Sequence, residues 1–325
     1  MNRNVSQLVI ATPAVWSAMI SAESVVAQNA TPRPLQASFD RQFDPVIRSW
    51  CEPHHSSLLV DMGVIFMARE GSAFQTELVD SGTGDTFFTK SLNHGFDGGF
   101  YIETTALLTE NWRGEFGYYG VGDWTATGQV EDPNDLTEIS ADVRYEANLQ
   151  SLQWNLATDP TLDTTFRLGL RYLSYSDSFD EQFTRPAGIN PAVTERSFGE
   201  AENFMLGPQA GIGYGKSIGP LWIDGFLNLV LLHNSMQQSG PAFNNAIVID
   251  GVNEPRFSVE ESDVTYAAEF GSNAVLPIFE RLQLSVGYRG LKLDEVLESA
   301  NQNGDPAGRS RVSFHGATFS LIWFR

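Results

Sequence analysis

The sequence predicts an all-β fold: an antiparallel transmembrane β-barrel of about ten strands, with eight or twelve as alternatives, preceded by a cleavable signal peptide. Three observations predict it. Long and short connections alternate along the chain, as they do when short turns gather on one side of a membrane and long loops on the other. Several strand-like stretches alternate apolar and polar residues. After the N-terminal segment there is no run of about 18 apolar residues, which argues against a helical membrane protein.

Ten stretches have the character of strands, and nine connections separate them. The expected strands are 58–68, 98–108, 112–124, 142–157, 164–178, 203–216, 221–236, 263–278, 281–296 and 311–325. The long connections are 69–97, 125–141, 179–202, 237–262 and 297–310, and the short ones are 109–111, 158–163, 217–220 and 279–280. An even strand number puts both barrel ends on the short-turn side, which is periplasmic in single-chain bacterial barrels.

Alternation within the strands predicts which face meets lipid and which faces the lumen. The stretch 281–290 separates the two kinds of residue cleanly, with Leu282, Leu284, Val286 and Tyr288 on its apolar face. The stretch 142–157 changes parity along its length. Its apolar residues are first Val143, Tyr145 and Ala147, and then Leu152, Trp154 and Leu156. We expect a β-bulge near residues 149–151 to reconcile the two halves.

Tryptophan residues fall near the ends of the expected strands, where an indole ring can sit at a membrane interface with its N–H in the headgroup layer. They are Trp112, Trp124, Trp154, Trp222 and Trp323. Soluble sheets also place tryptophan near edges, so this pattern supports a barrel only together with the rhythm of the connections.

The polar parity gives a set of residues expected to line the lumen, with six acids facing five arginines. These are Asp61, Glu103, Arg113, Glu115, Arg144, Glu146, Arg167, Arg171, Asp224, Glu269 and Arg289. They predict either a charged constriction that selects solutes or ion pairs that fill a narrow barrel, because about eight strands enclose only enough space for side chains. Ten strands favour the second interpretation, and any pore should be narrow.

The formal net charge is −20, which argues against nucleic-acid binding and favours cations. Since the expected lumen is almost neutral, the excess acid should lie in the long connections. The residues concerned are Glu131, Asp132, Asp135, Glu138, Asp180, Glu181, Glu195, Glu200, Glu254, Glu260 and Glu261.

The N-terminus has the features of an export signal. Arg3 supplies a positive charge, residues 8–20 are mostly apolar or small, and Val25–Ala27 has the small residues of a cleavage site. We expect residues 1–27 to be a signal peptide, residues 28–57 a proline-containing periplasmic lead-in, and residues 58–325 the barrel. The expected location is the outer membrane.

Several apparent motifs lack the spacing that their chemistry requires. The stretch 210–217, AGIGYGKS, ends like a phosphate-binding loop, but Ala210 stands where the first glycine is needed; lumen-side or bend glycines explain it better. Cys51, His54 and His55 have no second Cys/His pair within reach for zinc. Asp305 is the only carboxylate in 301–308, so no calcium loop is indicated. The sequence predicts no metal, no cofactor and no catalytic residue.

A resemblance to a family rests on strand patterns over roughly residues 58–325. Its segments are YEANLQSLQWNLATDPTLDTTFRLGLRYLSY at 145–175, FMLGPQAGIGYG at 204–215, LWIDGFLNLV at 221–230, YAAEFGSNAVLPIFERLQLSVGYRGLKLDEV at 266–296, and the final FHGATFSLIWF. They resemble the outer-membrane β-barrel proteins of planctomycete-type bacteria, which are similar to the Legionella-type major outer membrane protein family, described as pore-forming. The terminal aromatic residue read by the barrel-assembly machinery is penultimate here, as Phe324.

These observations lead us to expect a narrow porin-like channel or a structural surface protein with acidic extracellular loops, and not an enzyme. The expected partners are outer-membrane lipid and lipopolysaccharide, the barrel-assembly machinery, and small solutes or cations, with no nucleic acid. Two alternatives stay open. One is a hydrolase at the barrel rim, for which His233, followed by Asn234 and Ser235, is the best-placed histidine; the other is a soluble secreted β-protein.

Overall fold

The computed structural model describes residues 58–70, 77–80, 86–88, 95–109, 111–131, 140–161, 163–185, 193–241, 256–299 and 309–325. All of them belong to one compact unit, residues 49–325. The expected signal peptide and lead-in, together with Cys51, His54 and His55, lie outside the described residues. The same holds for Asp132, Asp135, Glu138, Glu254 and Asp305.

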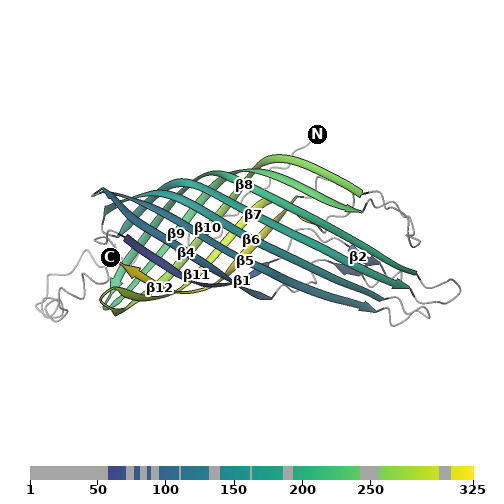
Figure 1. The fold of residues 1–325 in the computed structure, drawn as a ribbon, viewed down its shortest axis with the longest axis horizontal. Helices are drawn as coiled ribbons and strands as arrows, with labels where there is room; N and C mark the ends of the chain where they lie inside the picture. Colours follow the sequence, from purple (N-terminus) through teal and green to yellow (C-terminus); the bar gives the residue numbers. More distant parts are fainter. Residues whose placement is uncertain are drawn as a thin grey trace, which may run out of the picture. The chain divides into compact units, whose positions relative to one another are not determined.

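Ten strands close into an antiparallel barrel in the order β1-β12-β11-β10-β9-β8-β7-β6-β5-β4 (Figure 1), which confirms the predicted fold class and strand number. Their bounds are β1 Leu58–Glu70, β4 Phe96–Thr109, β5 Trp112–Glu131, β6 Ser140–Thr161, β7 Thr164–Arg185, β8 Val193–Ile218, β9 Leu221–Pro241, β10 Arg256–Phe279, β11 Leu282–Leu297 and β12 Arg309–Phe324. Within the first long connection, β2 (Glu77–Asp80) and β3 (Thr86–Phe88) form a separate two-stranded sheet.

Neighbouring strands join through short turns at one end of the barrel. Residues 219–220 connect β8 to β9 and residues 280–281 connect β10 to β11. Gly219 has φ +62°, a left-handed conformation that glycine adopts without steric cost. The barrel closes where β1 meets β12, with the Leu58 and Arg325 backbones hydrogen-bonded to each other. Both ends of the barrel therefore lie on the short-turn side, as predicted.

The strands continue well past the predicted ends on the side of the long connections. β7 runs to Arg185 and β8 begins at Val193, so only residues 186–192 separate them. Many acids expected in loops therefore stand on strand extensions. These are Glu131, Asp180, Glu181, Glu195, Glu200, Glu260 and Glu261.

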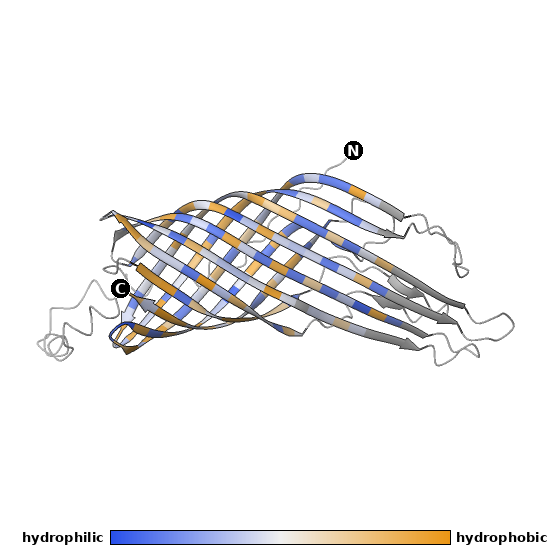
Figure 2. Cartoon of the chain, in the orientation of Figure 1, coloured by the Kyte–Doolittle hydropathy of each residue, from blue (hydrophilic) through white to orange (hydrophobic). Residues whose placement is uncertain are grey.

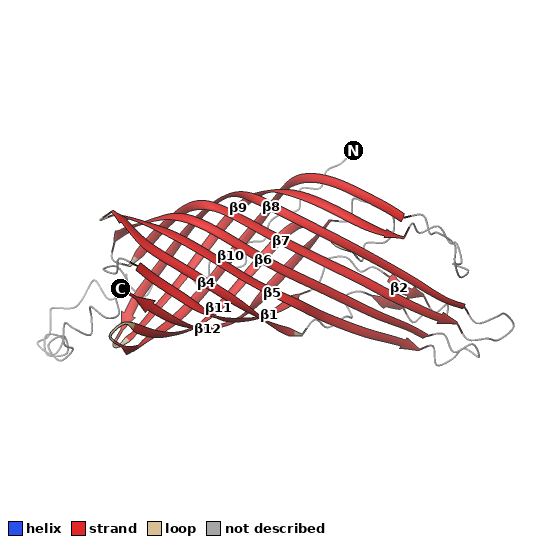
Figure 3. Ribbon diagram, in the orientation of Figure 1, coloured by secondary structure: helices blue, strands red, loops and turns tan. Residues whose placement is uncertain are grey.

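The outward face carries a belt of exposed apolar side chains near the short-turn end. Figure 2 shows hydrophobic (orange) and hydrophilic (blue) residues alternating along the strands there. On β7, Phe166, Leu168 and Leu170 are exposed, Leu168 by 64%. Farther along, the outward residues of β7 are polar, including Ser174 and Ser176. A closed barrel leaves no strand edge unpaired, and an apolar belt matches the hydrocarbon layer. In Figure 3 the strands are red and the short turns tan, and no blue helix is drawn among the described residues. No helix of these residues is long and apolar enough to cross a membrane.

The predicted bulge in β6 is wrong. β6 pairs with β7 without a register shift from Ser140 to Thr158, and its inward parity is constant from Val143 to Asn155. The shift lies instead in β5, between Val121 and Trp124. Within the apolar belt, the apolar residues of β6 face outward to lipid. Beyond the belt, toward the long-connection end, they face the inside of the barrel. The apolar residues therefore change from one alternating position to the other without a bulge.

Two of the five tryptophans do not lie at a lipid interface. Trp124 is buried in the barrel, and Trp222 lines an interior cavity. Three others do face outward: Trp112, Trp154 and Trp323 are exposed by 40% or more.

Candidate functional site

The barrel lumen is the candidate functional site. Nine of the eleven residues assigned to it by sequence parity have inward-facing side chains. Arg144 and Glu146 do not: they form an ion pair on the outward face of β6, with side chains 62% and 41% exposed. The prediction is wrong for these two residues because they lie beyond the apolar belt, toward the long-connection end. There the polar residues of the strand face outward into water instead of into the lumen.

A desolvated ion pair crosses the middle of the lumen between β7 and β10. Arg171 is 0% exposed and Glu269 1%. Two parallel bonds join them, Nη1 to Oε2 at 2.7 Å and Nη2 to Oε1 at 3.0 Å, the bidentate geometry that gives guanidinium–carboxylate pairs their strength. Tyr119, Gln153 and Asn228 also hydrogen-bond to the pair, and Nε of Arg171 is buried without a partner among the described residues.

A second arginine lies beside this pair. Arg289 on β11 donates to Glu103 on β4, across the barrel. Its guanidinium stands 5.2 Å from the ring centroid of Tyr119, 5.5 Å from Phe226 and 5.7 Å from Tyr101. These distances allow cation–π attraction. The alternation of residues along the strands predicted that Arg171 and Arg289 face the lumen. Nothing in the sequence marks the aromatic residues that surround Arg289.

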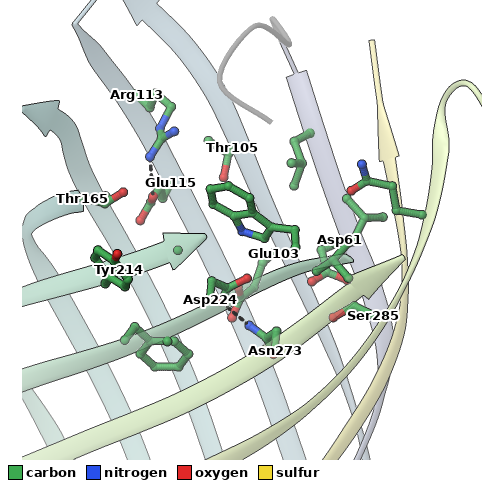
Figure 4. Close-up of a pocket in the computed structure, with 18 of the residues that line it drawn as sticks. Asp61, Glu103, Thr105, Arg113, Glu115, Thr165, Tyr214, Asp224, Asn273 and Ser285 are labelled. Atoms are coloured by element: carbon green, nitrogen blue, oxygen red, sulfur yellow. Dashed lines mark hydrogen bonds and ion pairs between the residues drawn. The ribbon is translucent and has the colours of Figure 1, made fainter. Parts of the chain in front are cut away.

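At the short-turn end the lumen opens into a cavity of about 200 Å³ (Figure 4). Two arginines line it. Arg167 donates to Glu115 at 2.9 Å, and Arg113 pairs with Asp159 at 2.9 Å. Figure 4 shows Asp61, Glu103 and Asp224 grouped around the same space.

Toward the long-connection end, apolar side chains fill the lumen. Phe314 on β12 stands 5.7 Å, centroid to centroid, from Tyr175 on β7, although these strands lie on opposite sides of the barrel. Trp124 packs 5.1 Å from the same phenylalanine ring and donates its indole N–H to the Met67 carbonyl at 2.7 Å. Side chains from opposite walls therefore pack against each other across the lumen at this level.

A polar cluster lies next to the apolar layer. Arg69 donates to the hydroxyls of Tyr145 at 2.9 Å and Tyr175 at 3.0 Å, and it also pairs with Glu298. Asp177 accepts from the Tyr175 hydroxyl at 3.3 Å. The sequence does not reveal this cluster, because its members come from three strands and from the segment after β11 and share no local pattern.

The end of β11 turns into the lumen at this cluster. Its register with β12 shifts between Leu293 and Val296, and Glu295 has φ 54°. Asn203 on β8 then holds Leu297 by both backbone groups, donating to its carbonyl at 2.8 Å and accepting from its N–H at 2.9 Å. Ser299 N–H donates to Asp177 at 3.0 Å. Residues 297–299 are thus held inside the barrel against β7 and β8.

The two histidines among the described residues, His233 and His315, do not contribute to a lumen site. His233 lies on the outward face of β9, while its neighbour Asn234 is buried inside. His315 pairs with Glu70 at 3.0 Å, and both belong to the outward parity of their strands. Over the described part of the chain, no group of three or more His, Cys, Asp or Glu side chains is arranged to hold a metal ion.

No protein-family model and no curated protein matches this chain. Among solved structures, it is similar to the outer membrane protease OmpT from Escherichia coli, at 10% identity and TM-score 0.49, over 82% of this chain and 96% of that one. It is also similar to the translocator domain of the autotransporter NalP from Neisseria meningitidis, at 12% identity and TM-score 0.38, over 89% and 96%. It is similar to the Pseudomonas putida toluene transporter TodX as well, at 8% identity and TM-score 0.29, over 82% of this chain and 89% of that one.

Likenesses at this identity carry no information about activity. The closed barrel and its apolar belt decide the broad class, because a closed antiparallel barrel of this kind spans outer membranes. The chain is an outer-membrane β-barrel protein.

Proposed function

We propose that this protein is a closed outer-membrane barrel with a structural role at the cell surface, and not a porin-like channel. The observation that carries the proposal is the contact between Phe314 and Tyr175 on opposite walls of the lumen. An open channel needs water along its whole length, whereas Arg171 and Glu269 are fully desolvated. On this proposal the strand extensions present acidic side chains above the outer leaflet.

The partners that fit this role are outer-membrane lipid and lipopolysaccharide around the belt, and the barrel-assembly machinery during insertion. No hydrolytic activity is part of the proposal, since His233 faces away from the lumen. The belt argues against a soluble secreted protein. Recovery in the outer-membrane fraction, with heat-modifiable migration on a detergent gel, tests that point.

Planar-bilayer recording tests the structural role. The refolded wild-type protein should give no stable single-channel steps, while a general porin prepared in the same way conducts. Regular conductance steps from wild-type protein, shown to be folded by its heat-modifiable migration, would overturn the proposal and favour a porin-like channel. Liposome swelling with small sugars gives an independent readout of the same question.

A further inference from the structure

Two cavities adjoin at the short-turn end of the lumen. The outer one measures about 200 Å³ and the inner one about 100 Å³. Both are lined by Glu103, Glu115, Arg167 and Phe226, so the inner space continues from the outer one. Together they have room for a small organic molecule, since one water occupies about 30 Å³ in the liquid.

The outer cavity has carboxylates that lack a cationic partner. Asp224 accepts a hydrogen bond from the Asn273 amide at 2.9 Å, and Asp61 accepts one from the Tyr101 hydroxyl at 3.5 Å. Neither forms an ion pair with a lysine or arginine of the described residues, whereas Glu103 pairs with Arg289 and Glu115 with Arg167. Charges held away from bulk water favour an opposite charge nearby.

The inner cavity carries both charges, because Glu103 and Glu115 line it together with Arg167 and Arg289, and several of its polar atoms have no hydrogen-bond partner in the described part of the chain. Arg289 is 7% exposed, and its Nη1 is buried with no hydrogen-bond partner, as is Nη1 of Arg167. Both side chains line this cavity. Asn228, 4% exposed, adds an unpartnered Oδ1. Buried polar atoms without partners are uncommon in folded proteins and call for a ligand or ordered water.

The walls favour an organic cation over a metal ion. Trp222 and Phe226 line the outer cavity beside the carboxylates, and aromatic rings attract ammonium groups. No arrangement of three or more metal-ligating side chains occurs within the described ranges. Divalent ions of the calcium type need about six oxygen ligands, which two separate carboxylates do not supply.

We propose that these two cavities form a binding site for a small zwitterion of the amino-acid class. Its ammonium group lies in the outer cavity and is held by Asp61 and Asp224. Its carboxylate reaches the inner cavity and accepts from Nη1 of Arg167 and Arg289. The site opens at the short-turn end, which is the periplasmic side of the membrane, so the zwitterion would enter from the periplasm. The site does not depend on whether the lumen conducts.

Three probes of equal chain length test the charge arrangement: 4-aminobutyrate, butylamine and butyrate. Isothermal titration calorimetry on the full-length protein folded in detergent micelles should detect binding of 4-aminobutyrate, weaker binding of butylamine and none of butyrate. Butyrate binding as well as 4-aminobutyrate would overturn the proposal. Equal binding of 4-aminobutyrate and butylamine would remove the role of the arginines, and no binding of any probe would leave the cavities as water-filled space only.

Matched variants locate the site. Asp224→Asn and Asp61→Asn each remove one carboxylate at nearly constant shape and should weaken 4-aminobutyrate binding by on the order of tenfold or more, as expected for a charge-assisted hydrogen bond. Asp142→Asn removes the same charge from an exposed position on β6 and should leave affinity unchanged. Heat-modifiable migration confirms folding of each variant. Unchanged affinity in both cavity variants would contradict the assignment.

Discussion

The buried pair of Arg171 and Glu269 gives the sharpest test of a filled lumen. Glu269→Gln keeps the size of the side chain but removes the negative charge. Arg171 then loses its bidentate partner, held at 2.7 and 3.0 Å, while it stays fully buried. An amide N–H₂ group also replaces one acceptor oxygen, so a donor faces a donor. Removing one partner of such a buried pair costs about 3–5 kcal/mol of unfolding free energy.

The protein supplies a control of the same chemistry. Glu146→Gln breaks the exposed pair with Arg144, whose side chain is 62% exposed, and pairs of this kind contribute about 1 kcal/mol or less. Equilibrium unfolding in guanidinium chloride, in lipid vesicles and followed by tryptophan fluorescence, measures both variants as shifts of the midpoint. Replacing Arg171 and Glu269 together by leucine should restore most of the loss, because well-packed apolar side chains can substitute for a buried pair.

A filled lumen is refuted if Glu269→Gln loses no more stability than Glu146→Gln. That result would mean that water reaches Arg171 and screens its charge. The lumen would then be hydrated through its middle, and the proposal of a closed barrel would fall with it.

Two further predictions concern the barrel wall. Gly316→Ala should lower stability by about 1–3 kcal/mol or impair closure, since an added Cβ would stand 1.7 Å from the Phe66 carbonyl oxygen; Gly225→Ala, whose nearest atom is 3.4 Å away, should change it little. Leu168→Arg on the apolar belt should cost about 2–4 kcal/mol, whereas Ser176→Arg, farther along the same face of β7, should cost about 0–1. Equilibrium unfolding in lipid vesicles measures the stability of all four variants. Equal losses of stability in the two glycine variants would contradict the close approach at Gly316. Equal losses in the two arginine variants would contradict the position of the apolar belt.

The barrel and its strand number could be predicted from the sequence because they depend on local features. Turns such as residues 219–220 and 280–281 interrupt runs of alternating residues, and each break is visible without knowledge of the partner strand. The glycines of β8 were also predictable as lumen-side residues. Gly211 and Gly213 leave room for Asn228 and for Arg167, which an added Cβ would meet at 2.1 and 2.7 Å.

The contents of the lumen could be predicted only in part. Parity identifies which side chains point inward, but not which of them meet. Asn203 and Leu297 are far apart in sequence yet hydrogen-bonded, and nothing local marks the end of β11 as a segment that turns inward. Trp124 was misplaced for a related reason, since a tryptophan near a strand end suits an interface and a packed interior equally well.

The misread bulge in β6 locates the membrane boundary. Below the boundary lipid surrounds the barrel, so apolar residues face out; above it water does, so apolar residues face in, as in a soluble barrel. On β6 the change falls between Leu149, buried inside, and Leu152, exposed outside. Leu152 pairs with Tyr172 on β7, and Tyr172 pairs with Leu206 on β8.

On β7 and β8, the next two strands around the barrel, the change occurs at that level. Leu173 and Met205 are buried inside, and Leu206 is exposed outside. One continuous line across three strands is what a membrane surface requires, whereas a bulge would shift a single strand. Above this line the wall faces water, so its interior has to pack as the core of a soluble protein does, around Phe314, Tyr175 and Trp124. On the proposal of a closed barrel, the inward side chains of the strands themselves close the lumen.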